Sequence, residues 1–135
     1  MSYGNKSLED YKYEIARINE ANGWFDSERT FGDEIALIHS EVSEALEEFR
    51  THGFEDKTIE LCCRNKFNND LVAHDKSLHN NGHVCKPEGI GSELADILVR
   101  VLDTCHRHDI DLEKELRRKL RYNATRGYRH GGKNL

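Results

Sequence analysis

The chain has 135 residues, of which 36% are hydrophobic and 33% are charged, and its formal net charge at pH 7 is −5. This length allows one domain with a hydrophobic core, and the single proline leaves long stretches free to be helical. The sequence has no apolar run near the ~18 residues of a membrane span, no N-terminal signal region and only four cysteines, so we expect a cytoplasmic protein without a membrane partner.

The charge is unevenly distributed along the chain. Residues 112–135 hold eight Lys/Arg against two Glu, a net +6, so the other 111 residues carry −11. An acidic body suits a metal ion and a basic end suits phosphates, although such asymmetry is also typical of an ordinary solvated surface.

Residues 7–22 are predicted to form the first helix. Ser7 is a suitable N-cap with Asp10 three residues on, and Gly23 follows the helix end. Trp24, the only tryptophan, comes next. It can be interpreted as a base-stacking residue or, in the commoner role of a large aromatic, as a side chain buried at the helix junction.

Residues 34–50 have the apolar periodicity of an amphipathic helix that ends before Gly53. Away from the apolar face lie Glu41, Glu44 and Glu48, spaced by three and four residues, with no lysine at matching spacing. Like charges at this spacing repel one another along a helix, so the row of glutamates needs an explanation.

Residues 55–91 differ from the rest, being rich in Asn, His and Gly. We expect a short helix near 56–66 and an irregular insertion otherwise. The segment contains residue types that bind zinc, but their spacing does not match a CxxC knuckle, which disfavours a structural zinc site. These residues are Cys62, Cys63, His79, His83 and Cys85.

The next helix is predicted to start at Ser92 and to be apolar around most of its circumference, which is typical of a largely buried helix. Its polar residues form one narrow stripe, which is therefore unlike a plain solvated face. Asp103 and His106 resemble half of a di-iron ligand set, but the Glu-x-x-His motifs of such sites are absent. The stripe consists of Glu93, Asp96, Arg100 and Asp103.

The last helix is predicted from Asp111 to about Arg126, with a leucine at every fourth position, and a basic, Gly-rich tail follows at 127–135. The leucines are expected to attach this helix to the core. The sequence shows no internal repeat, so we expect a single domain over 1–135.

Two predicted helices each present an acidic pair at i, i+3 spacing. These pairs are Glu41/Glu44 and Glu93/Asp96. If the pairs face each other, four carboxylates converge and need a cation, and all-oxygen ligands suit Mg²⁺ or Mn²⁺. A lone ExxE is usually a solvated surface, but the second pair on a largely buried helix favours a metal site. Glu48 fits either interpretation.

The segments "HSEVSEALEEFR", "ELADILVRVLD" and "KLRYNATRGYRHGGK" together resemble the MazG-like all-α nucleotide pyrophosphohydrolases, in particular their short stand-alone members. The segment "KPEGIGSELADIL" adds to the resemblance, which covers about 100 of the 135 residues. The insertion at 55–85 departs from the family pattern, in which these helices are joined more briefly.

The resemblance implies an all-α helical bundle completed by assembly into a homodimer or homotetramer. It implies cleavage of (deoxy)nucleoside triphosphates to the monophosphate and pyrophosphate with Mg²⁺, for which Mn²⁺ is a possible substitute. Glu41 or Glu44 would act on the attacking water. The implied metal ligands are Glu41, Glu44, Glu93 and Asp96. The implied substrate-binding residues are Lys119, which would also take part in catalysis, Asn123, Arg126 and Lys133, and we add Trp24 to them.

The alternative is a non-enzymatic helical module that binds nucleic acid or a protein partner through its basic C-terminal segment, in which "ELRRKLR" is typical of phosphate contacts. This alternative leaves the Glu93/Asp96 pair unexplained, so a nucleic-acid partner is the less favoured expectation.

Overall fold

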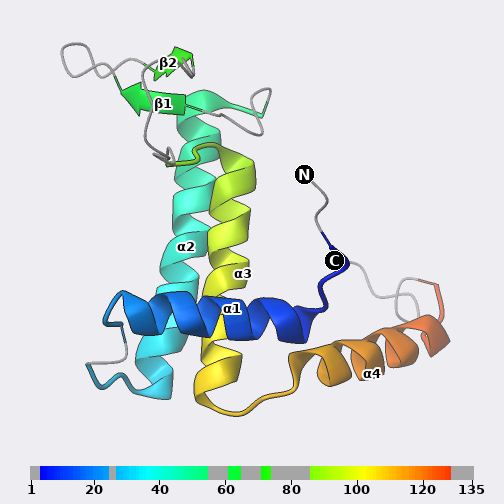
Figure 1. Ribbon diagram of the computed structural model, residues 1–135. Coiled ribbons are helices and arrows are strands. Elements are labelled where there is room, and N and C mark those ends of the chain that lie inside the picture. The colour runs from blue at the N-terminus through cyan, green and yellow to red at the C-terminus, as the bar shows by residue number, and fades with distance from the viewer. Residues whose placement is uncertain (1–3, 25–26, 55–60, 65–70, 74–85, 129–135) are drawn as a thin grey trace. The chain divides into compact units, whose positions relative to one another are not determined.

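The computed structural model is dominated by four helices, as predicted for an all-α protein (Figure 1). It describes residues 4–24, 27–54, 61–64, 71–73 and 86–128. The helices are α1 (Leu8–Ala21), α2 (Phe31–His52), α3 (Ile90–Arg107) and α4 (Leu112–Thr125).

Side chains at the helix starts explain where the first two helices begin. Ser7 and Asp10 form the predicted capping box of α1, each side chain bonding the other residue's backbone N–H. Thr30 and Asp33 form the same motif. Because Thr30 caps the chain there, α2 begins three residues before the predicted start at 34.

The other two helices differ in how well their starts were predicted. Asp111 caps α4 as expected, accepting the backbone N–H of Lys114 at 3.0 Å. The prediction that α3 starts at Ser92 is wrong, because the helix begins at Ile90. The Ser92 hydroxyl instead donates to the carbonyl oxygen of Pro87 at 3.2 Å.

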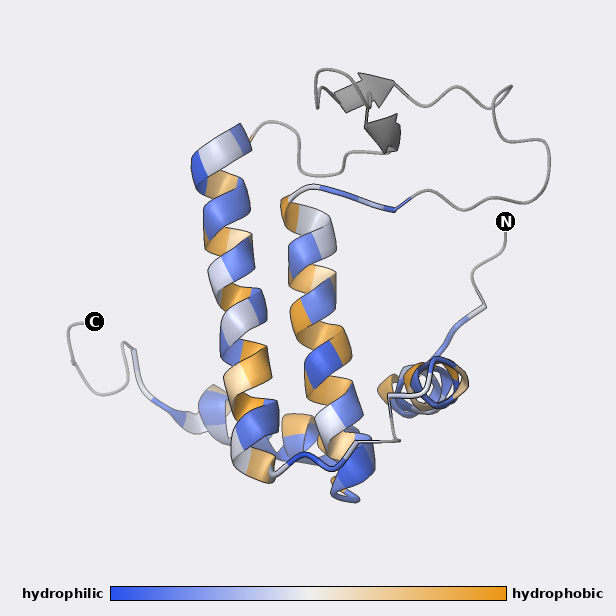
Figure 2. Ribbon diagram, turned by 90° about the vertical axis from the view of Figure 1, so that its left-hand side faces the viewer, coloured by the Kyte–Doolittle hydropathy of each residue, from blue (hydrophilic) through white to orange (hydrophobic). Residues whose placement is uncertain are grey.

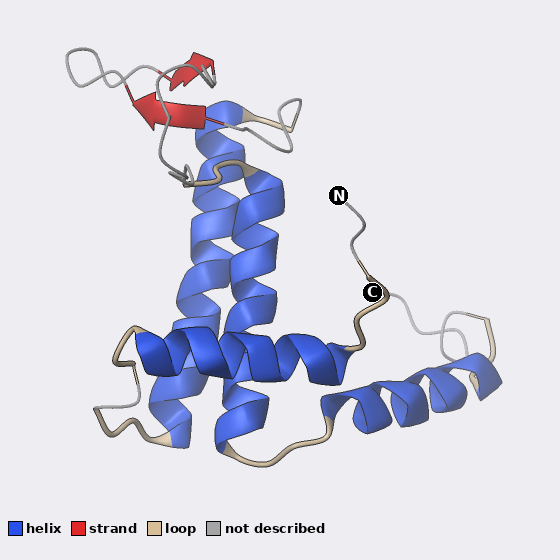
Figure 3. Cartoon of the chain, in the orientation of Figure 1, coloured by secondary structure: helices blue, strands red, loops and turns tan. Residues whose placement is uncertain are grey.

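Two short strands depart from the all-helical prediction (red in Figure 3). β1 (Leu61–Arg64) pairs antiparallel with β2 (Leu71–Ala73), with a register shift within the pair. The helix predicted near 56–66 is therefore wrong at 61–64, since pairing with the next strand along the chain satisfies this backbone in a way that local helix propensity cannot foresee. The remainder of 56–66, and His79, His83 and Cys85, lie outside the described residues.

The chain divides into two compact units, with the boundary inside α3. Unit 1 comprises Met1–Arg29 and Val101–Leu135, and unit 2 comprises Thr30–Arg100. The expectation of a single domain stays a prediction. Among the described helices, none has both the length and the apolar character needed to cross a membrane.

Unit 1 is organised around buried residues of α1 and the end of α3. Ala16, Leu102 and Cys105 form its buried apolar centre, and Leu102 is only 1% exposed. Burial raises the pKa of the Cys105 thiol, which therefore stays protonated and unreactive at neutral pH.

Asp103 ties this centre together with both of its carboxylate oxygens. Oδ1 accepts from Asn19 Nδ2 of α1 at 3.0 Å, and Oδ2 accepts from Arg107 Nε at 2.9 Å. Arg107 also donates through Nη2 to the carbonyl oxygen of Trp24 at 3.1 Å. The ring of His106 meets Tyr13 edge-on, with centroids 5.9 Å apart. Asp103 and His106 thus make structural contacts, which further weakens the di-iron interpretation.

We predict that Asp103→Ala lowers the free energy of unfolding by about 3 kcal/mol, because it leaves the largely buried guanidinium of Arg107 without its carboxylate. Urea denaturation measures the change. The control is Glu115→Ala, which removes the partner of Arg118 from a pair whose side chains are 70% and 52% exposed. That variant should lose less than about 1 kcal/mol, and equal losses in the two variants would contradict a central role for Asp103.

Candidate metal centre

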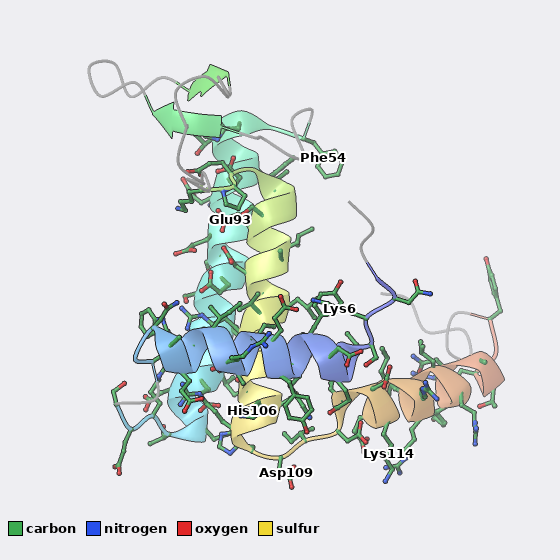
Figure 4. The ribbon with its side chains drawn as sticks, in the orientation of Figure 1. Lys6, Phe54, Glu93, His106, Asp109 and Lys114 are labelled. Atoms are coloured by element: carbon green, nitrogen blue, oxygen red, sulfur yellow. The ribbon has the colours of Figure 1, made fainter. Side chains whose placement is uncertain are left out.

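The acidic residues predicted as metal ligands come from α2 and the first half of α3, which lie side by side in Figures 1 and 2. Figure 2 shows hydrophobic and hydrophilic residues alternating along both helices. Glu93, labelled in Figure 4, belongs to the first turn of α3. The helices run in opposite directions, so residues later in α3 meet residues earlier in α2.

Three carboxylates converge between these helices. Glu41, Glu93 and Asp96 each offer an oxygen, and the three oxygens lie within 4.8 Å of one another. Ligands on opposite sides of a Mg²⁺ ion with Mg–O distances near 2.1 Å lie about 4.2 Å apart. The spacing of the three oxygens is therefore close to that of ligands around one ion, and an all-oxygen donor set fits Mg²⁺ or Mn²⁺.

Glu44, the fourth predicted ligand, lies beside this trio rather than within it. Its pKa is raised, first because it hydrogen-bonds to Glu41 and then by the negative charges of Glu41 and Asp96. Glu44 is exposed, whereas Glu41 is only 8% exposed. Glu44 and Asp96 are thus both open to solvent with a raised pKa, but only Asp96 is one of the three converging carboxylates.

The carboxylates of α3 also repel their neighbours. Burial raises the pKa of Glu93, as do the charges of Asp96, Glu44 and Glu48. Burial likewise raises the pKa of Asp96, helped by the charge of Glu41. The cluster therefore stores electrostatic repulsion that a bound cation would relieve.

Two basic residues that the sequence analysis did not assign to the site act on this cluster. Arg100 Nε donates to Glu41 Oε1 at 2.8 Å, and Lys86 lowers the pKa of Glu44, Glu93 and Asp96 through its positive charge. Arg100 was recognised as part of the polar stripe of α3, and its position four residues after Asp96 was the signal that it shares the same helix face.

Glu48, which fitted either interpretation, lies at the edge of the cluster. Its side chain is 14% exposed, and its Oε1 lies 2.9 Å from His52 Nδ1, one turn further along α2. Its charge contributes to the raised pKa of Glu93. Glu48 is thus an electrostatic neighbour of the site and is not one of the three converging ligands.

The predicted phosphate-binding residues lie in unit 1. Lys119 and Asn123 are exposed on α4, and the guanidinium of Arg126 lies 5.7 Å from the centroid of the Tyr122 ring. Lys133 lies outside the described residues. Their predicted role at a common substrate site stays a prediction.

Trp24 departs from the burial that its interpretation as a helix-junction side chain required. It is 52% exposed, and the guanidinium of Arg29 lies 5.9 Å from its ring centroid. Its predicted role in substrate binding stays a prediction.

The surface of α4 differs from the expectation that its leucines attach it to the core. Leu116 and Leu120 are 43% and 57% exposed, and α4 has no buried residue. Most of its basic residues lie on a face away from Lys119, around a hollow of about 340 Å³. The hollow is lined by Asp111, Glu113, Lys114, Arg117, Arg118 and Arg121.

Comparison with known proteins adds no assignment: no family model, no curated protein and no solved structure matches this chain.

We predict that Glu44→Gln and Asp96→Asn each raise the melting temperature in EDTA at neutral pH. A carboxyl whose folded pKa is raised binds more protons in the folded state, so the folded protein loses stability as pH rises above the ordinary carboxyl pKa through the raised folded pKa. Each variant removes one such cost, and its advantage should vanish at acidic pH, where the carboxyls are protonated in both states. Melting curves across pH test this, and an advantage that persists in acid would contradict the electrostatic origin.

Proposed function

We propose that this protein is a Mg²⁺-dependent nucleoside triphosphate pyrophosphohydrolase of the MazG-like all-α type, which releases the monophosphate and pyrophosphate. The observation that carries the proposal is the convergence of Glu41, Glu93 and Asp96 from two helices. Both acidic pairs of the family resemblance contribute to this convergence. Such a cluster lowers the stability of the fold unless a cation neutralises it, and cation binding is the function that its chemistry favours.

Glu41, Glu93 and Asp96 would hold the Mg²⁺, with Glu44 beside them. When bound, the ion supplies positive charge to phosphate oxygens and acidifies a water. Glu44 then has the clearest role among the carboxylates. Its raised pKa and exposure suit it to take a proton from the water that attacks the α-phosphorus.

Attack of this water at the α-phosphorus breaks the bond to the bridging oxygen, and pyrophosphate leaves with the bonding electrons. Lys119 and Arg126 are proposed to cover the β and γ groups, where positive charge stabilises the leaving group, and Asn123 is proposed to bind the sugar or phosphates. Trp24 is a candidate platform for the base.

We predict that hydrolysis of a nucleoside triphosphate in ¹⁸O-water places the label in the monophosphate and releases intact pyrophosphate, as measured by mass spectrometry. Lys119→Ala should slow turnover by about 10²-fold while leaving Mn²⁺ binding unchanged, since it acts on charge that develops in the leaving group. Arg117→Ala, on a different face of α4, is the matched control and should retain turnover. Label in orthophosphate, or a nucleoside diphosphate as first product, would place the chemistry at the γ-phosphorus and contradict the proposal.

We also propose that the protein assembles into a homodimer or homotetramer. α3 was predicted to be largely buried, yet Leu94 and Leu98 are 56% and 48% exposed, as are Val42 and Leu46 of α2, each at 50%. Apolar side chains exposed at helical spacing along two neighbouring helices are typical of a surface that another subunit covers.

We predict that Val42→Glu shifts the assembly toward a single-chain species in analytical ultracentrifugation, because a charge cannot be buried in an apolar interface without a partner. Ser43→Glu adds the same charge at the neighbouring position, about 100° away around α2, and should leave the assembly intact. A wild-type protein that sediments only as a single chain at micromolar concentration would contradict the assembly.

The hollow on α4 supports the alternative function, a helical module that binds an anionic partner through Lys114, Arg117, Arg118 and Arg121. A module of this kind would bind its partner without the carboxylates of unit 2. Thermal melting separates the two functions, since a metal-binding enzyme should melt at a higher temperature in Mg²⁺ or Mn²⁺ than in EDTA, whereas the module should not respond.

A further inference from the structure

We infer that Arg100 is a positioning residue of the metal centre, which fixes the carboxylate of Glu41 in the orientation that lets it share an ion with Glu93 and Asp96. This inference rests on the proposed function, since it assigns a role toward the ion that the carboxylates would hold.

The contact between Arg100 and Glu41 has the geometry of a charge-assisted hydrogen bond. Nε of Arg100 lies 2.8 Å from Oε1 of Glu41, and the two side chains are 32% and 11% exposed. Partial burial makes such a bond stronger and more directional than an exposed ion pair. Glu41 is therefore held from α3 through Oε1, and an oxygen of the same carboxylate lies within 4.8 Å of the other two ligands.

Glu41 is the ligand for which such positioning matters most. It is the most buried of the three and the only one that comes from α2, and it interacts electrostatically with the neighbouring Glu44. Without Arg100, the charges of Glu44, Glu93 and Asp96 would push this carboxylate away from them. Partners that orient ligating carboxylates commonly contribute about 10- to 100-fold to metal affinity or activity.

A positioning role and a simple charge effect predict opposite results. Arg100 is a cation close to the place of another cation, so on charge alone its removal should strengthen metal binding. If Arg100 positions Glu41, its removal should weaken binding despite the lost repulsion. The sign of the change in affinity thus distinguishes the two explanations.

The test measures binding of Mn²⁺ alone to the full chain, by electron paramagnetic resonance of the free ion, without triphosphate. We expect Arg100→Gln to bind Mn²⁺ about 10- to 100-fold more weakly than wild type. Arg100→Lys keeps the charge but loses the planar guanidinium, so we expect it to bind several-fold more weakly. Equal or tighter binding by Arg100→Gln would overturn the inference.

Controls separate this inference from its premise. Arg50→Gln removes the same charge from unit 2, where Arg50 pairs with Glu47 at 3.8 Å and both side chains are more than 60% exposed, and it should bind Mn²⁺ as wild type does. Should Arg100→Gln fail to fold, as judged by circular dichroism, Arg100→Lys decides, and unchanged Mn²⁺ binding by that variant overturns the positioning role.

The carboxylate variants test the premise itself. If Glu93→Gln and Asp96→Asn bind Mn²⁺ as tightly as wild type, the metal centre is wrong. If they lose Mn²⁺ while Arg100→Gln retains it, the centre stands and only the role of Arg100 is wrong.

Discussion

The repulsion among the carboxylates between α2 and α3 is the constraint on which the rest of unit 2 depends. One oxygen each of Glu41, Glu93 and Asp96 lies within 4.8 Å of the other two, and Glu44 interacts electrostatically with Glu41. Burial and the negative charges of neighbouring carboxylates raise the pKa of both Glu93 and Asp96, so keeping these groups ionised costs free energy. Arg100, by direct contact with Glu41, and Lys86, by its charge, partly offset this cost. The cluster therefore lowers the stability of the folded chain, and under the proposed function a bound divalent cation would offset this cost.

The polar stripe of α3 performs two different tasks along its length. In the first half, Glu93 and Asp96 lie close to Glu41 of α2, and Arg100 donates a hydrogen bond to the same glutamate. In the second half, the two carboxylate oxygens of Asp103 accept hydrogen bonds from Asn19 and Arg107, which stabilises the centre of unit 1. The difference lies in the partners. A carboxylate with two donors is satisfied and structural, whereas carboxylates that face one another remain short of positive charge.

Exposed hydrophobic side chains are a second feature of the helices that calls for an explanation. Leu94 and Leu98 of α3 and Leu116 and Leu120 of α4 are all more than 40% exposed, so the helices retain apolar faces that the described residues do not cover. The candidate metal centre shares α3 with Leu94 and Leu98, and it shares α2 with the exposed Val42 and Leu46. An assembly that covers the faces would also restrict the motion of α2 and α3, which supports a link between subunit association and the geometry of the carboxylates.

The sequence by itself determined what depends on neighbours three and four residues away. Apolar periodicity and the residues Ser7, Asp111 and Gly53 located the helices, and the spacing of Glu41, Glu44, Glu93 and Asp96 placed the acidic pairs on helix faces. Only the tertiary structure decided what depends on segments far apart in the chain. Arg100 bonds to Glu41 across 59 positions, and Glu44 lies beside the trio rather than within it. The pairing of Leu61–Arg64 with Leu71–Ala73 spans a shorter stretch of chain, but it too replaces the helix expected from local propensity. The physical reason is that helix register follows from local geometry, whereas the choice of a hydrogen-bond partner depends on which faces two separate helices turn toward each other, and this comes from packing and charge over the whole unit.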